Sequence, residues 1–293
     1  MDLQTAPTTT FQPDVDAIIR LALSEDIGTG DVTSLATVPA GQMASGVMLA
    51  KAEGVLSGIE VARAVFQAVD PAITFTPHLA DGDRLTPGTA IAAVAGPARA
   101  LLTAERTALN LVQRLSGVAT QTARYVAATE GTNASIVDTR KTTPGLRLLE
   151  KRAVMHGGGR NHRFGLADGV LIKDNHLAAI GGARRITTAV ERARQLAPHT
   201  LKVEIEVTSL DELREALDAR ADIVMLDNMD TPEIAEAVAI RDAHAHHALL
   251  EASGGITLAR IPEIAATGVD LISVGALTHS APALDISLDL ALT

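Results

Sequence analysis

The stretch from Asp138 to His176 concentrates positive charge in a chain whose formal net charge is -10. It holds eight Lys or Arg residues against four acids. Solvated helix faces explain part of this excess, since Arg147, Lys151 and Arg152 fall in the helical pattern LRLLEKRAVM. The remaining cations of interest lie at expected strand ends or in glycine-rich loops, where side chains converge on ligands. They are Arg140, Lys141, Arg163 and Lys173. The segment therefore predicts a cationic pocket for a small, highly charged anion.

Six short apolar segments in the second half of the chain read as strands. They span 135–137, 170–172, 202–207, 223–226, 249–252 and 271–274, with helical stretches such as 210–219, 232–243 and 258–266 between them. Alternation of strand and helix predicts parallel β/α units. We expect an incomplete TIM-like β/α barrel of six or seven strands, and an open doubly wound sheet is the structural alternative.

The ends of these strands carry the residues that could do chemistry. Arg140 and Lys141 follow the first strand, Lys173 ends the second, Glu206 lies late in the third and Asp227 ends the fourth. Two glycine turns, ASGGI and SVGAL, end the last two strands and contribute Ser253, Gly254, Gly255, Val274, Gly275 and Ala276. Glycine lets backbone approach a ligand, and barrels commonly bind phosphate after their last two strands, so we expect a monophosphate site there.

Glu206 and Asp227 are two carboxylates in an otherwise cationic pocket. They would suit sugar hydroxyls, a Mg²⁺ ion carried in by a phosphorylated substrate, or an oxocarbenium-like centre. Glu204 shares the strand face of Glu206, and periodicity leaves open which of the two points at the ligand.

Histidines occur in two different settings. His162 precedes Arg163 after GGGRN, and this loop predicts two anion-binding side chains. By contrast, His244, His246 and His247 read as a helix end in solvent, with a metal site as the alternative.

The first part of the chain predicts a smaller α/β domain. We expect a helix over 15–23, a plain connector over 24–34, a strand at 47–50, a helix over 59–69, and strands at 73–78 and 90–95. A helix over 103–115 places Arg106 and Asn110 on one face and should break at Gly117, with a second helix to about 129. The expected domains are therefore 1–116, 117–276, and a segment 277–293 that returns to the first domain's sheet.

Composition excludes several classes of function. The chain lacks cysteine, which excludes disulfides, thiolate zinc sites and cysteine nucleophiles. One Tyr, four Phe and no Trp argue against a stacking platform for nucleic acid, and the acidic balance argues against phosphate-backbone binding. No apolar run reaches the ~18 residues of a membrane span. Residues 1–13 lack a signal-peptide pattern and read as a disordered tail, so we expect a cytoplasmic protein that binds neither membranes nor nucleic acid.

Long motifs resemble the quinolinate phosphoribosyltransferase family: DTRKTTPGLRLLEKRAV, GGGRNHRFGLADGVLIKDNH, EIEV, LDN, EASGGI and ERTALN. The resemblance implies an N-terminal α/β sandwich followed by an incomplete β/α barrel. It also implies a Mg²⁺-dependent reaction of quinolinate with phosphoribosyl pyrophosphate. The products would be nicotinate mononucleotide, CO₂ and pyrophosphate, a step of de novo NAD synthesis.

The same resemblance implies residue roles. Arg140, His162, Arg163 and Lys173 look like the quinolinate carboxylate binders, and Lys141 looks like a catalytic contact to phosphate or pyrophosphate beside Thr139. Glu206 and Asp227 resemble the acidic pair near the ribose and metal, and their spacing favours Glu206 over Glu204. The two glycine turns resemble phosphate loops. Arg106 resembles an arginine that reaches into the partner subunit's site, which implies a homodimer.

Two alternatives stay open. One is an enzyme of the same fold that acts on nicotinate or on a molybdenum-transport-associated substrate. The other is a non-catalytic ligand sensor. A substrate with one carboxylate needs fewer cations than Arg140, Arg163 and Lys173 supply, and a sensor could dispense with Glu206 and Asp227.

Overall fold

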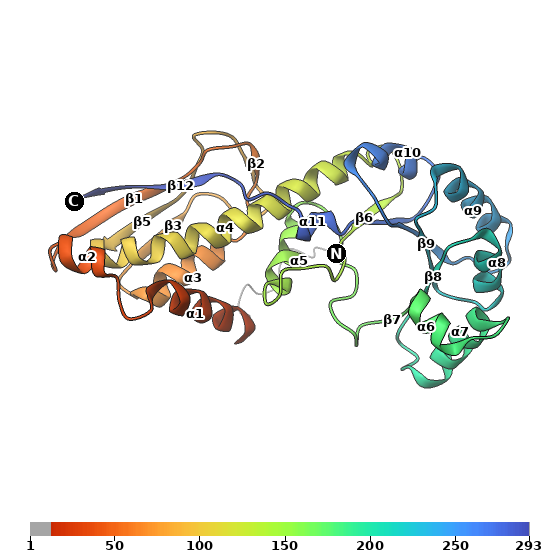
Figure 1. Ribbon diagram of the computed structural model, residues 1–293. Helices are drawn as coiled ribbons and strands as arrows, with labels where there is room; N and C mark the ends of the chain where they lie inside the picture. The colour runs from red at the N-terminus through yellow and green to blue at the C-terminus, as the bar shows by residue number, and fades with distance from the viewer. Residues whose placement is uncertain (1–12, 293) are drawn as a thin grey trace. The chain divides into compact units, whose positions relative to one another are not determined.

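The computed structural model describes residues 13–292 (Figure 1). The tail expected over 1–13 lies outside this range except for Pro13, which begins a helix. The described chain forms two compact units. The first comprises residues up to Thr120, Thr143–Gly157 and the segment from Ala281, and the second comprises Gln121–Thr142 and Gly158–Ser280. The segment Thr143–Gly157 thus belongs with the first unit, whereas the sequence analysis placed it in the barrel domain.

The first unit is built on a four-stranded antiparallel sheet in the order β12-β1-β5-β3. These strands are β1 (Met43–Ala50), β3 (Thr74–Pro77), β5 (Ala90–Pro97) and β12 (Ile286–Leu292). The C-terminal strand β12 pairs with β1, which confirms that the end of the chain returns to the first sheet. Two short strands, β2 (Gly54–Val55) and β4 (Arg84–Leu85), form a separate pair that the sequence analysis missed. A two-residue strand is too short to show a period.

Helices of the first unit cover a core of aliphatic side chains and Phe66. Helix α3 (Ile59–Val69) has the predicted bounds. Helix α1 (Pro13–Ile27) continues into the first four residues of the expected connector, and α2 (Val32–Thr37) begins where Asp31 accepts a hydrogen bond from Ser34 N at 2.9 Å. The prediction of a connector over 24–34 is therefore wrong except at 28–31, because a side-chain N-cap starts a new helix within it.

Helix α4 (Ala98–Ala127) is continuous, so the predicted break at Gly117 is wrong. A Cβ at Gly117 would collide with the backbone oxygen of Pro282. Next to it, Gln113 Nε2 donates to Ile286 O at 2.7 Å and Arg114 Nη1 donates to Ala281 O at 2.8 Å. Glycine at 117 thus lets the C-terminal segment cross the helix at close range, rather than ending the helix.

Helix α5 (Arg147–His156) was expected to turn Arg147, Lys151 and Arg152 to water. That expectation is wrong for Lys151, which is only 2% exposed. Glu150 is also fully buried and accepts from Arg114 Nη2 and Thr143 Oγ1, each at 2.7 Å. The helix is enclosed within the first unit, so part of its polar face is buried as well.

The second unit carries a six-stranded sheet in the order β6-β11-β10-β9-β8-β7, with all pairings parallel. The strands are β6 (Ser135–Val137), β7 (Val170–Ile172), β8 (Val203–Val207), β9 (Ile223–Asp227), β10 (Leu249–Ser253) and β11 (Leu271–Ser273). From β7 to β11 each strand pairs with the next one in the sequence, and β6 then pairs with β11. This cyclic order is that of a barrel and lacks the reversal of a doubly wound sheet.

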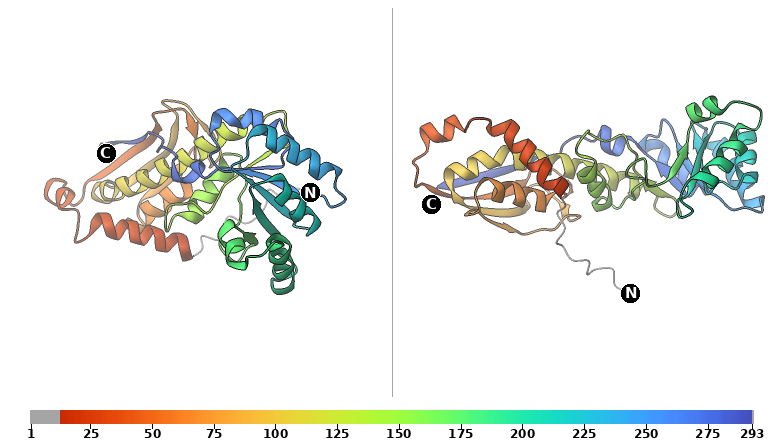
Figure 2. Two further views of the ribbon diagram at one scale, coloured as in Figure 1. Left: turned by 45° about the vertical axis from the view of Figure 1, so that its right-hand side comes forward. Right: turned by 90° about the horizontal axis from the view of Figure 1, so that it is seen from below.

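The barrel is incomplete between β6 and β7. Beside β6, the backbone of Arg160 forms a single parallel bridge to Val137, with Arg160 N donating to Ile136 O at 2.9 Å. Helices α7 (Arg185–Leu196), α8 (Leu210–Asp218) and α9 (Thr231–Ala243) lie along the outer side of the sheet (Figures 1 and 2). Shorter helices complete the unit: α6 (Asp174–Ile180), η1 (Leu258–Arg260), α10 (Ile261–Ala265) and α11 (Ala276–His279). The predicted incomplete β/α barrel is confirmed.

Among residues 13–292, no helix combines the length and the apolar character that a membrane span needs.

Replacing Gly117 with alanine should lower the free energy of unfolding by about 1–3 kcal/mol, because the added methyl collides with Pro282. A glycine that merely interrupted the helix would respond in the opposite sense, with a gain of up to ~1 kcal/mol. Chemical denaturation measures the sign of the change in the free energy of unfolding, and this sign decides between the close-approach and the helix-break explanations. Gly41→Ala is the matched control, since nothing lies within 4 Å of its added Cβ. An increase in stability for Gly117→Ala would contradict the close-approach explanation.

Candidate active site

A cavity of about 360 Å³ lies at the C-terminal ends of the strands of the second unit. Predicted site residues from five successive strand ends and one loop line it together. They are Thr139, Arg140, Lys141, His162, Arg163, Lys173, Glu206, Asp227, Ser253, Gly254 and Gly255. The parallel sheet accounts for this gathering, because the C-terminal ends of all its strands meet at one edge.

The remaining predicted residues lie elsewhere. Val274, Gly275 and Ala276 are outside the cavity lining, yet a Cβ at Gly275 would lie 3.1 Å from Lys141 Cδ. Thr278 Oγ1 also donates to Lys141 O at 2.8 Å. This turn therefore supports Lys141 from behind. Arg106 is an exposed residue of α4 in the first unit.

A buried carboxylate, that of Asp138, fixes the backbone on the cationic side of the cavity. Asp138 is fully buried at the end of β6 and accepts from His162 N at 2.8 Å. Thr139 Oγ1 accepts from Lys141 N at 3.0 Å. Burial lowers the pKa of the Arg163 guanidinium, and the charge of Arg140 lowers it further. An anion between these two guanidiniums would relieve both effects.

The acidic side of the cavity faces Lys173, whose Nζ lies 3.5 Å from Glu206 Oε2. Burial raises the pKa of Glu206, Lys173 opposes this, and Asp227 and Asp174 add to the rise. Asn228 Nδ2 donates to Asp227 Oδ2 at 2.7 Å and so orients that carboxylate. A Cβ at Gly254, where φ is +89°, would collide with Asn228, so this turn requires glycine.

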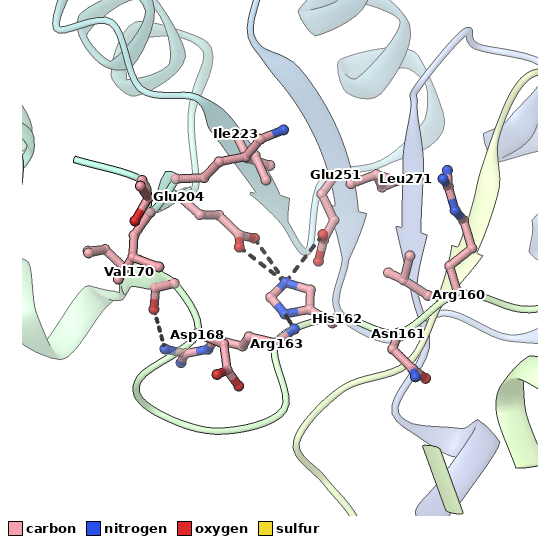
Figure 3. Close-up of a pocket in the computed structure, with 15 residues that line it drawn as sticks. Arg160, Asn161, His162, Arg163, Asp168, Val170, Glu204, Ile223, Glu251 and Leu271 are labelled. Atoms are coloured by element: carbon pink, nitrogen blue, oxygen red, sulfur yellow. Dashed lines mark hydrogen bonds and ion pairs between the residues drawn. The ribbon is translucent and has the colours of Figure 1, made fainter. Parts of the chain in front are cut away.

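Below these residues, the interior of the barrel holds a cluster of three side chains (Figure 3). His162 Nε2 lies 3.1 Å from Glu204 Oε2 and 3.6 Å from Glu251 Oε2. Arg163 N donates to His162 Nδ1 at 2.7 Å, so the ring proton of a neutral His162 sits on Nε2 and points at Glu204. Among residues 13–292 these three side chains form the one group of three or more His, Asp or Glu residues whose nitrogen and oxygen ligand atoms lie within 4.8 Å of one another.

Glu251 is the residue that sequence reasoning missed. Its side chain is fully buried, and neither carboxylate oxygen has a hydrogen-bond partner within residues 13–292. Burial raises its pKa to about 7, and the charge of Glu204 contributes to the rise. The available signal was its position two residues before Ser253, which puts both on the inward face of β10. Glu204 and Glu206 share one face in the same way, with Glu206 in the strand-end cavity and Glu204 deeper against His162.

Comparisons with known proteins agree with this fold. Models of the quinolinate phosphoribosyl transferase N-terminal and C-terminal domains match residues 31–116 and 118–289. The chain belongs to the quinolinate phosphoribosyltransferase family.

Relatives match over nearly the whole chain. A probable nicotinate-nucleotide pyrophosphorylase [carboxylating] of Bacillus subtilis is 46% identical and covers 92% of this chain and 91% of its own. The Mycobacterium leprae nicotinate-nucleotide pyrophosphorylase [carboxylating] is 47% identical, with 93% and 95% covered. The crystal structure of NadC from Streptococcus pyogenes superposes with a TM-score of 0.91 at 41% identity, covering 98% of this chain and 100% of that one.

The second histidine cluster lies apart from the site of this family member. His244 Nε2 lies 3.1 Å from Asp218 Oδ1, and His246 Nε2 lies 2.8 Å from Ala221 O. Both side chains are half-buried, so the expectation of a solvent-facing helix end holds only for His247, which is exposed. These contacts join the end of α9 to the residues around the start of β9, which is a structural role.

The raised pKa of Glu251 predicts a pH-dependent stability. The folded chain keeps this proton up to about pH 7, whereas the unfolded chain loses it near the ordinary value of 4.5. The resulting stabilisation is complete below the unfolded value and is lost as the pH rises through the folded one. The loss should reach about 3 kcal/mol at most. Denaturation between about pH 5 and 8.5 measures it.

Glu251→Gln should flatten this dependence, since glutamine does not titrate. Glu191→Gln, at an exposed position of α7, is the matched control and should keep the wild-type slope. A Glu251→Gln variant with the full wild-type slope would assign the pH dependence to other groups.

Proposed function

We propose that this chain transfers the phosphoribosyl group of phosphoribosyl pyrophosphate to the ring nitrogen of quinolinate. Loss of CO₂ then gives nicotinate mononucleotide, and pyrophosphate is the other product. A quinolinate phosphoribosyltransferase [decarboxylating] of Nicotiana tabacum, 41% identical over 291 residues, supports this reading along with the pyrophosphorylases. The observation that carries it is the single cavity that combines carboxylate-binding cations, an acidic pair and a glycine turn.

Arg140, Arg163 and Lys173 supply positive charge for binding an aromatic acid with two negative charges. Arg140 and Arg163 repel each other in the partly buried cavity. The two carboxylates of quinolinate would reduce this repulsion, and the two guanidinium groups would bind them. Lys173 adds a donor, and His162 lines the same cavity beside Arg163. In this proposal, these four residues hold quinolinate with its ring nitrogen toward the acidic pair.

Transfer itself requires positioning more than proton chemistry. A pyridine nitrogen has a free lone pair, so its attack on the anomeric carbon needs no general base. As pyrophosphate leaves, positive charge grows on the ribose, and the carboxylates of Glu206 and Asp227 stabilise it. Lys141 would neutralise the departing phosphate from the opposite side of the cavity.

Glu206 and Asp227 also fit a Mg²⁺ ion that arrives with the diphosphate. Burial raises the pKa of Glu206 and the charge of Asp227 adds to the rise, and a divalent cation would offset the repulsion between the two carboxylates. When bound, the ion neutralises charge on the diphosphate leaving group. Ser253, Gly254 and Gly255 would hold the 5′-phosphate through backbone N–H groups, since both glycines have positive φ and carry no side chain to block the approach. The turn at Val274, Gly275 and Ala276 belongs to the same proposed phosphate site.

Arg106 enters the proposal as a residue given to a partner subunit. It is exposed on α4 and lies outside the strand-end cavity of its own chain. In a homodimer of twofold symmetry, each chain would lend this arginine to the other chain's quinolinate site.

The reaction is tested directly with purified protein. The protein should release CO₂ and pyrophosphate in equal amounts when given quinolinate, phosphoribosyl pyrophosphate and Mg²⁺ together. Omission of phosphoribosyl pyrophosphate or of Mg²⁺ should abolish CO₂ release. Nicotinate is the comparison substrate, since it lacks one carboxylate. Equal or faster turnover of nicotinate, without CO₂, would contradict the proposal.

Subunit exchange tests the role of Arg106. Arg106→Ala and Lys141→Ala should each be nearly inactive, because each removes a charge from every site. After mixing and exchange, half of the dimers are mixed and one of their two sites is intact, so activity should recover to about a quarter of wild type. Arg140→Ala mixed with Lys141→Ala is the matched control. It should not recover, since both residues line the cavity of their own chain and every site of a mixed dimer therefore carries one substitution. Verified exchange without recovery would place the action of Arg106 within its own chain.

A further inference from the structure

Glu251 lies where two cavities of the second unit meet. His162, Arg163 and Glu251 line both the strand-end cavity and a second cavity of about 410 Å³ (Figure 3). The second cavity reaches the opposite side of the barrel, since Lys202, Ile223 and Leu271 at the starts of β8, β9 and β11 also line it. The carboxyl group of Glu251 is thus buried in the floor of the proposed substrate site, where its Oε2 lies 3.6 Å from His162 Nε2.

The proposed reaction needs a proton at this floor. When the bond between the pyridine ring and its carboxylate breaks, the electron pair stays on the ring carbon and CO₂ leaves. That carbon must then gain a proton to give nicotinate mononucleotide. Without one, the carbanion recaptures CO₂ while both remain in the cavity. A group that donates a proton here therefore drives the step forward.

Four other groups that line the strand-end cavity hold their protons elsewhere, and Lys141 is assigned to the departing phosphate. Guanidinium groups such as Arg140 and Arg163 do not give up a proton at ordinary pH. The single ring proton of His162 points at Glu204, and Lys173 faces Glu206 at 3.5 Å. Glu251 is the carboxyl group in this set that can hold a proton near neutral pH, and His162 Nε2 lies 3.6 Å from its Oε2.

We propose that Glu251 is the general acid of the decarboxylation and gives its proton to the ring carbon that CO₂ leaves. The inference rests on the proposed function. The O–H bond of Glu251 breaks as the ring C–H bond forms, and Glu251 becomes a carboxylate. It regains a proton from water before the next turnover, and the second cavity provides a route for that water from the far side of the barrel.

The groups around Glu251 favour its protonated form while an anionic substrate is bound. Burial and the carboxylate of Glu204 on β8 raise its pKa, and His162 and Lys173 oppose this. Ser273 on β11 lies on the same wall and also opposes the rise, because its hydroxyl stabilises the ionised carboxylate. Substrate carboxylates add negative charge to the same cavity, so their binding should hold the proton on Glu251 more firmly.

Separate measurement of the two products tests the inference. In single turnovers, Glu251→Gln should form pyrophosphate at nearly the wild-type rate, while CO₂ release falls on the order of 10²-fold. Quinolinate mononucleotide, with both carboxylates, should accumulate. Glutamine has the shape and neutrality of a protonated glutamate, so the fold should persist. Glu251→Asp keeps an acid and should restore part of the CO₂ release.

Glu191→Gln, at an exposed position of α7 outside both cavities, is the matched control and should leave the ratio of CO₂ to pyrophosphate at the wild-type value. Parallel loss of both products in Glu251→Gln, or unchanged CO₂ release, would overturn the inference and leave Glu251 with a positioning role or none. The same split in Glu191→Gln would also overturn it. If the wild type forms no pyrophosphate from quinolinate, the proposed function itself fails.

Discussion

Repulsion between Arg140 and Arg163 is the interaction on which the rest of the site depends. Burial disfavours the charge of Arg163, and the neighbouring guanidinium disfavours it further. The fold maintains this arrangement through Asp138, a fully buried carboxylate that accepts the backbone N–H of His162 and so fixes the loop that carries both His162 and Arg163. A site built in this way is complementary to a small dianion before any ligand arrives, since the cost of gathering the charges is met by folding.

A second repulsion balances the first across the same cavity. Glu206 and Asp227 lie on neighbouring strands, and burial together with the charge of Asp227 raises the pKa of Glu206. Lys173 stands between the two sets with its Nζ 3.5 Å from Glu206. The cavity thus separates a wall suited to carboxylates from a wall suited to a cation or a developing positive charge. In the proposed transfer, quinolinate would therefore lie against the cationic wall and the ribose and metal against the acidic wall.

The incomplete barrel explains why charged groups can occupy its interior. In a closed eight-stranded barrel, layers of branched aliphatic side chains fill the centre. Here β6 and β7 do not pair within residues 13–292, and the backbone at Arg160 makes a single bridge to β6. Positions that would carry aliphatic side chains instead carry Glu204 and Glu251, and the loop residue His162 enters between them.

The sequence by itself determined the fold class and the strand-end series. The β/α alternation predicted all six strands of the barrel to within a residue at each end, because a buried parallel strand is a short apolar run that ends in polar residues or glycine. The same pattern placed Arg140, Lys173 and Asp227 at one edge, since parallel strands share their C-terminal direction. Long motifs also carried the family assignment.

Only the tertiary structure decided what depends on contacts between distant segments. Gly117 reads as a helix break, yet it lies within a continuous helix because Pro282 crosses there, 165 positions further along the chain. Lys151 reads as a solvated cation and is buried because α5 packs into the first unit. The spacing of Glu251 from Ser253 indicates its face of the strand but not its protonation state. Its burial, its proximity to His162 and Glu204, and its raised pKa arise from three segments that only the tertiary fold brings together.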